Sequence, residues 1–207
     1  MAYSDFIHIA QLENQFGIRQ TFAKIFTTTP LIEPSEHLKI DLADAQEMPL
    51  LNSEKAKSEF LIVPVLKEIR RRNRHFSIFS GYTFDVDKEQ SLVGICDYIL
   101  SAAIDSLEIK SPIFCLVEAK NRTTVEGIPQ VASEMIAAQI FNEKAHNSIS
   151  VIYGCVSTGT EWLFLKLENK ILTIDTNSYY LIPSDLPRLL GMLNEVVTHN
   201  LVYSQAS

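Results

Sequence analysis

Two short stretches place charged side chains inside otherwise apolar sequence. Asp97 interrupts the apolar run 93–100, and Glu118 and Lys120 close the run that begins at residue 113. Burying an unpaired charge is costly, so charges in such runs are expected to have partners or a function. Because side chains alternate along a strand, Glu118 and Lys120 point to the same face. Two acids and a lysine that converge at the level of a sheet suit a magnesium-dependent phosphodiesterase.

The chemistry explains why these residue types matter together. Phosphodiester hydrolysis needs a metal ion, carboxylates that hold it, and a cation that positions the nucleophile or stabilises charge. Magnesium is held by a few carboxylates together with water and substrate oxygens, and Asp97 and Glu118 on neighbouring strands could supply the carboxylates. Lys120 lies about 7 Å further along the strand than Glu118, within reach of a phosphate or the attacking water. The alternative is a structural salt bridge between Glu118 and Lys120, with Asp97 as a third member.

Three further polar residues lie on helices predicted around these strands. Gln130 occupies the first turn of the following helix, where backbone N–H groups favour phosphate, and its amide could orient a water or a phosphate oxygen. Glu134 shares that helix face and is expected to be a solvated partner of a lysine or arginine. Glu59 precedes the apolar segment 60–64 and can reach a site formed by the sheet. For Gln130 and Glu59, a place on the polar surface of their helices is the alternative.

Hydrophobic periodicity and turn residues predict the elements that must position these side chains. The sequence favours one α/β domain over 1–207 with a mixed sheet, in which an N-terminal helical and loop extension (1–50) precedes a core (53–180) and a C-terminal helix (184–203). The expected elements, in order, are a helix over 4–26, a loop over 27–50 with a short strand near Leu38–Ile40, a helix from Asn52 or Ser53 to about Asn73 kinked at Pro64, a strand over 76–79, a hairpin of 82–86 and 91–100, a strand over 113–120, a helix from Gly127–Pro129 to about Lys144, a strand over 148–156, a hairpin of 162–167 and 170–175, and a helix from about Ser184 through Val196.

In this order of motifs, the chain resembles the PD-(D/E)XK nuclease superfamily, which has the restriction-endonuclease-like fold. The resemblance covers about residues 53–167. It consists of a helical acid before an apolar-Pro pattern (Glu59, then Val63-Pro64-Val65-Leu66), Gly94-Ile95-Cys96-Asp97-Tyr98, Val117-Glu118-Ala119-Lys120, a helix that opens with Gln130, and the strand-turn-strand Tyr153–Trp162. Cys96 stands where the family name has proline.

The resemblance implies a fold and a set of roles. The fold would be a mixed central sheet flanked by helices. Asp97 and Glu118 would bind Mg²⁺ or Mn²⁺, with Glu59 adding to the metal site. Lys120 would assist the nucleophilic water, and Gln130 would contact the substrate or the water. Members of the family are often dimers, so a homodimer or a partner subunit is a further expectation.

Composition sets limits on the function. The 207 residues carry a net charge of −7, which argues against non-specific nucleic-acid binding, although Arg70-Arg71-Arg72-Asn73-Arg74-His75 is a dense basic cluster. That cluster is either a solvated helix end or a phosphate-contacting patch. The three cysteines, Cys96, Cys115 and Cys155, lie in apolar runs and are expected to be free core thiols. No apolar stretch approaches the length of a membrane span, and the start lacks signal-peptide features, so a cytoplasmic protein without membrane contact is expected.

Three hypotheses follow from these observations. The first is a magnesium-dependent hydrolase that cuts DNA, with Asp97, Glu118, Lys120 and Gln130 at the catalytic site. The second is a nuclease-like interaction or regulatory module that does not cut. The third is a plain α/β core in which Glu118 and Lys120 pair only with each other and Asp97 lies far away. The sequence does not distinguish DNA from RNA as the substrate of the first.

Overall fold

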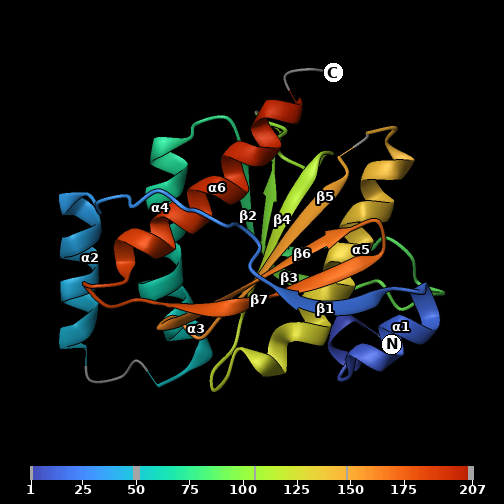
Figure 1. Cartoon of the computed structure of the whole chain (residues 1–207), viewed down its shortest axis with the longest axis horizontal. Coiled ribbons are helices and arrows are strands. Elements are labelled where there is room, and N and C mark those ends of the chain that lie inside the picture. Colours follow the sequence, from blue (N-terminus) through green and yellow to red (C-terminus); the bar gives the residue numbers. More distant parts are fainter. Residues whose placement is uncertain (1, 49–51, 105, 148, 205–207) are drawn as a thin grey trace.

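The fold is built around a mixed β-sheet. A computed structural model describes residues 2–48, 52–104, 106–147 and 149–204. In this part of the chain, seven strands form one sheet in the order β1-β7-β6-β5-β4-β3-β2, in which β1 and β7, and β4 and β5, are parallel and the other neighbours antiparallel (Figure 1). The strands are β1 (Arg19–Ala23), β2 (Ser77–Thr83), β3 (Ile95–Ser101), β4 (Ile113–Ala119), β5 (Val151–Ser157), β6 (Glu161–Glu168) and β7 (Ile171–Tyr180).

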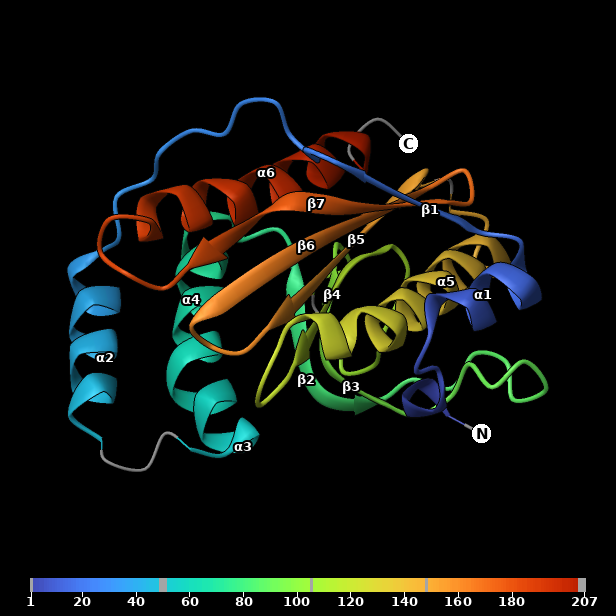
Figure 2. The same cartoon turned by 60° about the horizontal axis from the view of Figure 1, so that its bottom comes forward.

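Helices cover both faces of the sheet, so the molecule has three layers (Figure 2). One apolar core lies between the sheet and α4, α6 and α2, and the other lies between the sheet and α5 and α1. The helices are α1 (Ile9–Phe16), α2 (Glu36–Glu47), α3 (Glu54–Lys57), the π-helical segment η2 (Ser58–Ile62), α4 (Val63–Arg72), α5 (Ile128–Lys144) and α6 (Leu186–Ser204), with single 3₁₀ turns η1 (Tyr3–Asp5) and η3 (Val125–Gly127).

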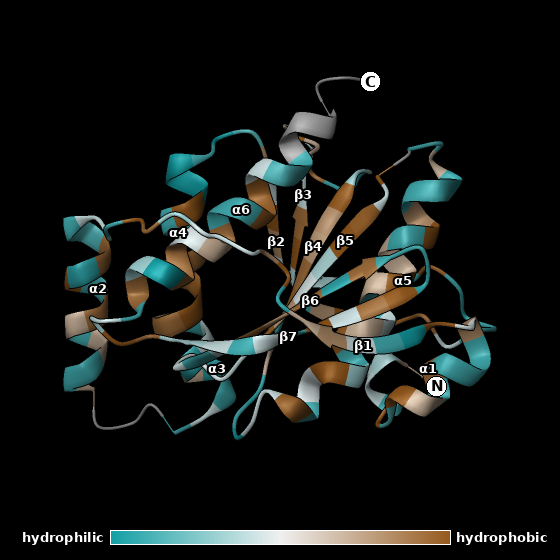
Figure 3. Cartoon of the chain, viewed as in Figure 1, coloured by the Kyte–Doolittle hydropathy of each residue, from teal (hydrophilic) through white to brown (hydrophobic). Residues whose placement is uncertain are grey.

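The central strands explain the apolar runs of the sequence. Every residue of β4 and β5 is buried, because helices pack on both sides of them. Figure 3 shows this pattern as hydrophobic strands at the centre of the sheet and mostly hydrophilic residues on α2. Cys96, Cys115 and Cys155 are buried free thiols, as predicted. Among the described residues, no helix has both the length and the apolar character that crossing a bilayer requires.

The predicted α/β class and mixed sheet are confirmed, and most elements from Ser53 onward fall within a few residues of their predicted bounds. Ser53 caps the helical segment that begins at Glu54 by accepting a hydrogen bond from the Ala56 N–H. The expected kink at Pro64 takes the form of the π-helical turn η2 directly before it, since proline cannot donate a regular helical hydrogen bond. The predicted strands 76–79 and 82–86 both overlap one element, β2, which pairs with β3, whereas residues 84–86 lie beyond its end.

The N-terminal region differs from its prediction. The expected helix over 4–26 ends at Phe16, because Gly17 adopts a left-handed conformation that caps α1, and the next residues form the edge strand β1. The expected loop is confirmed for residues 27–35, but the expected short strand near Leu38–Ile40 lies within α2, whose N-cap Ser35 accepts from the Leu38 N–H. Residues 49–51 and 148 of the predicted elements lie outside the described residues.

Candidate active site at the ends of β3 and β4

The end of β4 carries a lysine held by two acceptors. Lys120 Nζ lies 2.6 Å from Glu118 Oε1 and 2.9 Å from Gln130 Oε1. Glu118 is 3% exposed, whereas Ala119 between the two charged residues faces the other core, as predicted. The structure therefore brings together three of the predicted site residues, on β4 and the first turn of α5.

The close approach of α5 to β4 depends on Gly127. A Cβ atom at this position would lie 2.6 Å from Val156 Cγ1 and 3.0 Å from Lys120 Cγ. Glycine lets the chain turn over β4 and β5 without displacing the lysine stem. Pro129 lies in the first turn of α5, where its missing N–H costs no helical hydrogen bond, and Gln130 follows it.

Asp97 joins the site from the neighbouring strand. The β3–β4 register pairs Tyr98 with Val117, which places Asp97 and Glu118 at the next position along the two strands. Asp97 Oδ2 accepts a hydrogen bond of 2.8 Å from the backbone N–H of Ala119. The acid on β3 is therefore attached to the same strand end that carries Glu118 and Lys120.

Glu134 belongs to this cluster, and the prediction that it is a solvated partner of a basic residue is wrong. Its carboxyl is fully buried, and its Oε1 accepts from Gln130 Nε2 at 3.3 Å. The side chain points inward because α5 turns this face toward the sheet, where Val131 and Met135 are also fully buried. Among the described residues, Oε2 of Glu118 and Oε2 of Glu134 are buried with no hydrogen-bond partner.

Burial and mutual repulsion change the acidity of these carboxyls. Burial, together with the charge of Asp97, raises the pKa of Glu118 to about 8, although Lys120 opposes the shift. Burial and the charge of Glu118 also raise the pKa of Glu134 well above its ordinary value. Burial lowers the pKa of Lys120, but the attraction of Glu118 outweighs it and the net pKa is raised. Lys120 is therefore charged at neutral pH, whereas burial favours the protonated, neutral form of Glu118 and Glu134.

A groove opens beside Asp97 and Ala119. Its volume is about 360 Å³, and Tyr98, whose hydroxyl is hydrogen-bonded to Ser58 Oγ, is part of its wall. The π-helical segment η2 forms one side of it, a feature that is frequent at functional sites. The lining residues are Glu54, Lys55, Ser58, Glu59, Val63, Ser80, Gly81, Asp97, Tyr98 and Ala119.

The helical acid Glu59 lines this groove, but its carboxylate faces outward. It forms an ion pair of 3.0 Å with Lys55, and half of its side chain is exposed. Glu54 interacts with the cluster electrostatically, since its charge raises the pKa of both Glu118 and Lys120. Glu54 was not among the residues predicted for the site. The available signal was its position in the first turn after the Ser53 cap.

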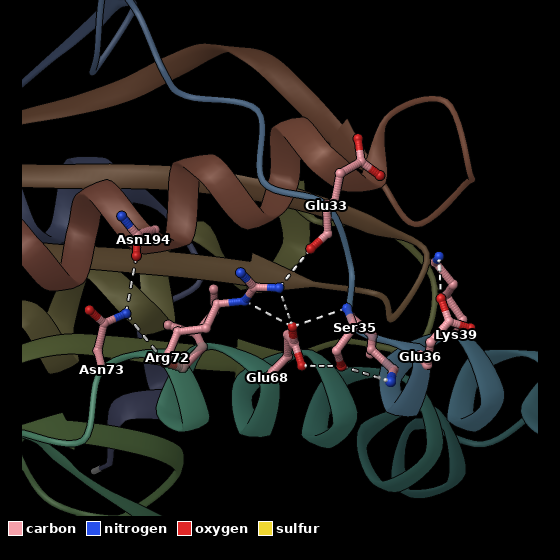
Figure 4. Close-up of polar contacts among 10 residues, drawn as sticks. Glu33, Ser35, Glu36, Lys39, Glu68, Arg72, Asn73 and Asn194 are labelled. Carbon is pink, nitrogen blue, oxygen red and sulfur yellow. Dashed lines mark hydrogen bonds and ion pairs between the residues drawn. The ribbon is translucent and has the colours of Figure 1, made fainter.

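The basic cluster at the end of α4 lies far from this site, because α3 and the residues of the groove are at the other end of the same helical unit (Figure 1). Arg72 donates to Glu68 Oε1 through Nε and Nη2, at 2.8 and 2.7 Å, and to the carbonyl of Glu33 (Figure 4). The Arg70 guanidinium lies 5.7 Å from the centre of the Phe76 ring. Two of the arginines therefore have structural contacts.

The cluster offers a restricted donor set for a metal ion. The described residues contain no group of three histidine, cysteine or acidic side chains arranged to hold one. Two carboxylates from adjacent strands, Asp97 and Glu118, still fit magnesium, because this ion commonly takes its remaining ligands from water and phosphate oxygens. The partnerless Oε2 of Glu118 is the specific atom on which this fit depends.

Comparison with known proteins identifies no family for the chain, since no family model matches it and no curated protein was found to be similar.

Proposed function

We propose that this protein is a magnesium-dependent nuclease that hydrolyses phosphodiester bonds in DNA, built on a restriction-endonuclease-like core. One observation carries the proposal: the Lys120 ammonium is held between Glu118 and Gln130, while Asp97 bonds to the backbone of the same strand end. A plain salt bridge would not need Gln130 as a second acceptor or an acid from the next strand. The order of elements from η2 to β5 also supports the resemblance to PD-(D/E)XK nucleases.

Each side chain has a role in this proposal. Asp97 and Glu118 would hold Mg²⁺ or Mn²⁺, with Glu59 or Glu54 approaching across the groove, and the bound ion would polarise the phosphate and lower the pKa of a water. Lys120 has three N–H donors, of which Glu118 and Gln130 take two. The third is left to donate to the attacking water or to a phosphate oxygen. Gln130 would help keep the lysine in place while Oε2 of Glu118 is available to a metal ion.

Two features favour the second candidate, a nuclease-like interaction or regulatory module that does not cut. The net charge is −7, and the described residues hold no three-ligand metal cluster. In that case the buried charges would serve only as a network within the fold. Under the first candidate, a homodimer or a partner subunit would contribute to substrate selection.

Cleavage of DNA by the wild type and by Lys120→Ala tests the proposal. Linear, circular and single-stranded DNA are incubated with each protein in Mg²⁺ or Mn²⁺, with EDTA as the metal-free control. We expect cleavage by the wild type only with metal, and a loss of about 100-fold or more in Lys120→Ala, because an oriented charge-stabilising donor is removed.

Lys166→Ala is the matched control for this substitution. Lys166 forms an ion pair of 2.9 Å with Glu168, two residues along β6, but does not reach the groove. It should leave cleavage unchanged. If no DNA is cut and the metal also fails to stabilise the wild type, the non-catalytic module is the better description.

A further inference from the structure

Glu134 is a buried acid that the proposed reaction does not use directly. It is fully buried in α5, and the described residues offer it no ion pair with a lysine, an arginine or a histidine. A buried carboxyl without a cationic partner costs stability. The carboxyl of Glu134 interacts with the Cys96 thiol, and its Oε1 accepts a hydrogen bond from Gln130 Nε2 at 3.3 Å. The hydrogen bond with Gln130 therefore suggests what Glu134 contributes to the molecule.

The amide of Gln130 has two different ends, and the site requires them in one order. The Lys120 ammonium can only donate, so it needs the amide oxygen, and the structure places Oε1 of Gln130 2.9 Å from Nζ. The amide nitrogen must then point the other way, and it needs an acceptor there. Glu134 Oε1 is that acceptor. A flipped amide would set N–H groups against the ammonium.

We propose that Glu134 is a positioning residue, which fixes the Gln130 amide and thereby holds the Lys120 ammonium at the end of β4. Its relevance to catalysis rests on the proposed nuclease function, whereas the positioning itself does not. The carboxyl works as a neutral acceptor, because its surroundings disfavour a negative charge. The groups that face it are Glu118 from β4, Asp97 and Cys96 from β3, Tyr3 from η1, and Lys120.

Three substitutions test this proposal. Glu134→Gln keeps the shape and an acceptor oxygen, whereas Glu134→Leu keeps the approximate volume and removes the acceptor. Glu143→Leu, at an exposed position near the other end of α5, is the matched control. We expect Glu134→Leu to lose about 10- to 100-fold in cleavage, as is typical when support of a site residue is removed. Glu134→Gln and Glu143→Leu should remain near the wild type.

A second measurement does not depend on cleavage. The NMR signal of the Lys120 side chain, assigned by its absence in Lys120→Ala, is compared at one pH in protein labelled at the lysine side chains. In Glu134→Leu we expect the chemical shift of this signal to move, because the Gln130 amide that accepts from the ammonium is no longer held in place. In Glu134→Gln it should stay at the wild-type position. Thermal melting of each variant reports whether the fold is intact.

A double-mutant cycle shows whether Glu134 acts through Gln130. If it does, Glu134→Leu in a Gln130→Leu background adds nothing further, so the two effects are not additive. Additive effects would overturn the proposal, as would a Glu134→Leu variant with wild-type cleavage and an unchanged Lys120 NMR signal. A Glu134→Gln variant as impaired as Glu134→Leu would also overturn it, since the acid itself would then be required. If the wild type cuts no DNA, the nuclease proposal fails and the Lys120 NMR signal still decides the positioning.

Discussion

The chemistry of a Lys and Glu pair depends on its surroundings more than on its spacing. The described residues include two such pairs, each two residues apart: Glu118 with Lys120, and Lys166 with Glu168. The side chains of Glu118 and Lys120 are 4% and 19% exposed, and those of Lys166 and Glu168 are 26% and 40% exposed. An exposed pair contributes little to stability. A buried pair next to further acids is costly, which is why the first pair is a candidate site and the second is not.

Magnesium is expected to stabilise the wild type, and to do so more strongly at higher pH. Without metal, the raised pKa of Glu118, about 8 in the folded state, means that the folded protein binds more protons than the unfolded chain, so stability falls as pH rises from about 4.5 through about 8. A metal ion competes with that proton. Its benefit to the folded state should therefore increase across the same interval.

Thermal melting with and without millimolar Mg²⁺, near pH 6 and near pH 8.5, measures this effect. Metal at about 100 times its dissociation constant would add about 2.7 kcal/mol to the free energy of unfolding. The Glu118→Gln variant, which cannot bind the ion as a carboxylate, should not respond to it. A wild-type melting temperature that is the same with and without metal at both pH values would contradict a magnesium site at Glu118.

At the scale of elements, prediction from the sequence was right for the strands and helix that carry the site and wrong for the N-terminal region. β4 and α5 were found within about a residue, because their signals are local: an apolar run for the strand, and Gly127 with Pro129 for the helix start. The strand β1 has every residue exposed, so it has no hydrophobic alternation, and it forms only because β7 offers a partner far along the chain. A local sequence pattern cannot predict such long-range pairing.

The same limit applies to the site. Asp97, Glu118, Lys120 and Gln130 could be named because they lie in or beside strong local signals. The inward orientation of Glu134 and the approach of Glu54 depend on how α5 and α3 pack on the sheet. A carboxyl on a helix is usually solvated, and this general preference was the reason for the wrong prediction about Glu134.

Gly191 offers a test of packing between an element and a segment distant in sequence. It lies in α6, where a Cβ atom would come within 1.8 Å of the backbone oxygen of Pro30. In a helix interior, glycine to alanine normally stabilises by about 1 kcal/mol. Gly191→Ala should instead destabilise the protein, by about 1–3 kcal/mol, because the backbone of residue 30 must move.

Chemical denaturation of Gly191→Ala measures this change, and Thr198→Ala, at a partly exposed position of the same helix, serves as the comparison for helix propensity. A stabilised Gly191→Ala variant would show that the segment before α2 does not rest on α6 as closely as described.

At the scale of the whole molecule, residues 24–35 connect the edge strand β1 with the distant helix α2. This segment leaves β1 at one edge of the sheet, crosses α6 and reaches α2 on the far side (Figure 2). The N–H of Ile32 donates to the carbonyl of Pro187 at 3.0 Å, and the Phe26 ring stacks on Tyr153 with centroids 5.7 Å apart. The segment thus closes over the core that supports η2 and the groove beside Asp97.

Glu68 anchors the end of this segment. It is 2% exposed, and its carboxylate accepts from the N–H and hydroxyl of Ser35 and from Arg72, which also donates to the carbonyl of Glu33 (Figure 4). Burial raises the pKa of Glu68, but the hydrogen bonds from Ser35 and Arg72 outweigh it, and the net pKa is lowered. A carboxyl with a lowered folded-state pKa stabilises the protein above its unfolded-state pKa, and this stabilisation is lost as pH falls through the folded-state pKa.

Glu68→Gln should therefore destabilise the protein near neutral pH and have little further effect in acid. The expected loss is about 1–3 kcal/mol near pH 7, because the amide brings donors toward Arg72 and cannot accept as a charged group. In acid, at a pH below its folded-state pKa, the wild-type carboxyl takes up its own proton, so the difference between the two proteins should shrink. Urea denaturation near pH 7 and in acid measures this difference in stability, with Glu36→Gln at an exposed ion pair as the control.

The two proteins must be compared at the same pH, because Glu118 and Glu134 have raised pKa values and make the wild type less stable as pH increases. A loss for Glu68→Gln that is equal at both pH values would mean that the fold depends on the shape of the Glu68 side chain and not on its charge.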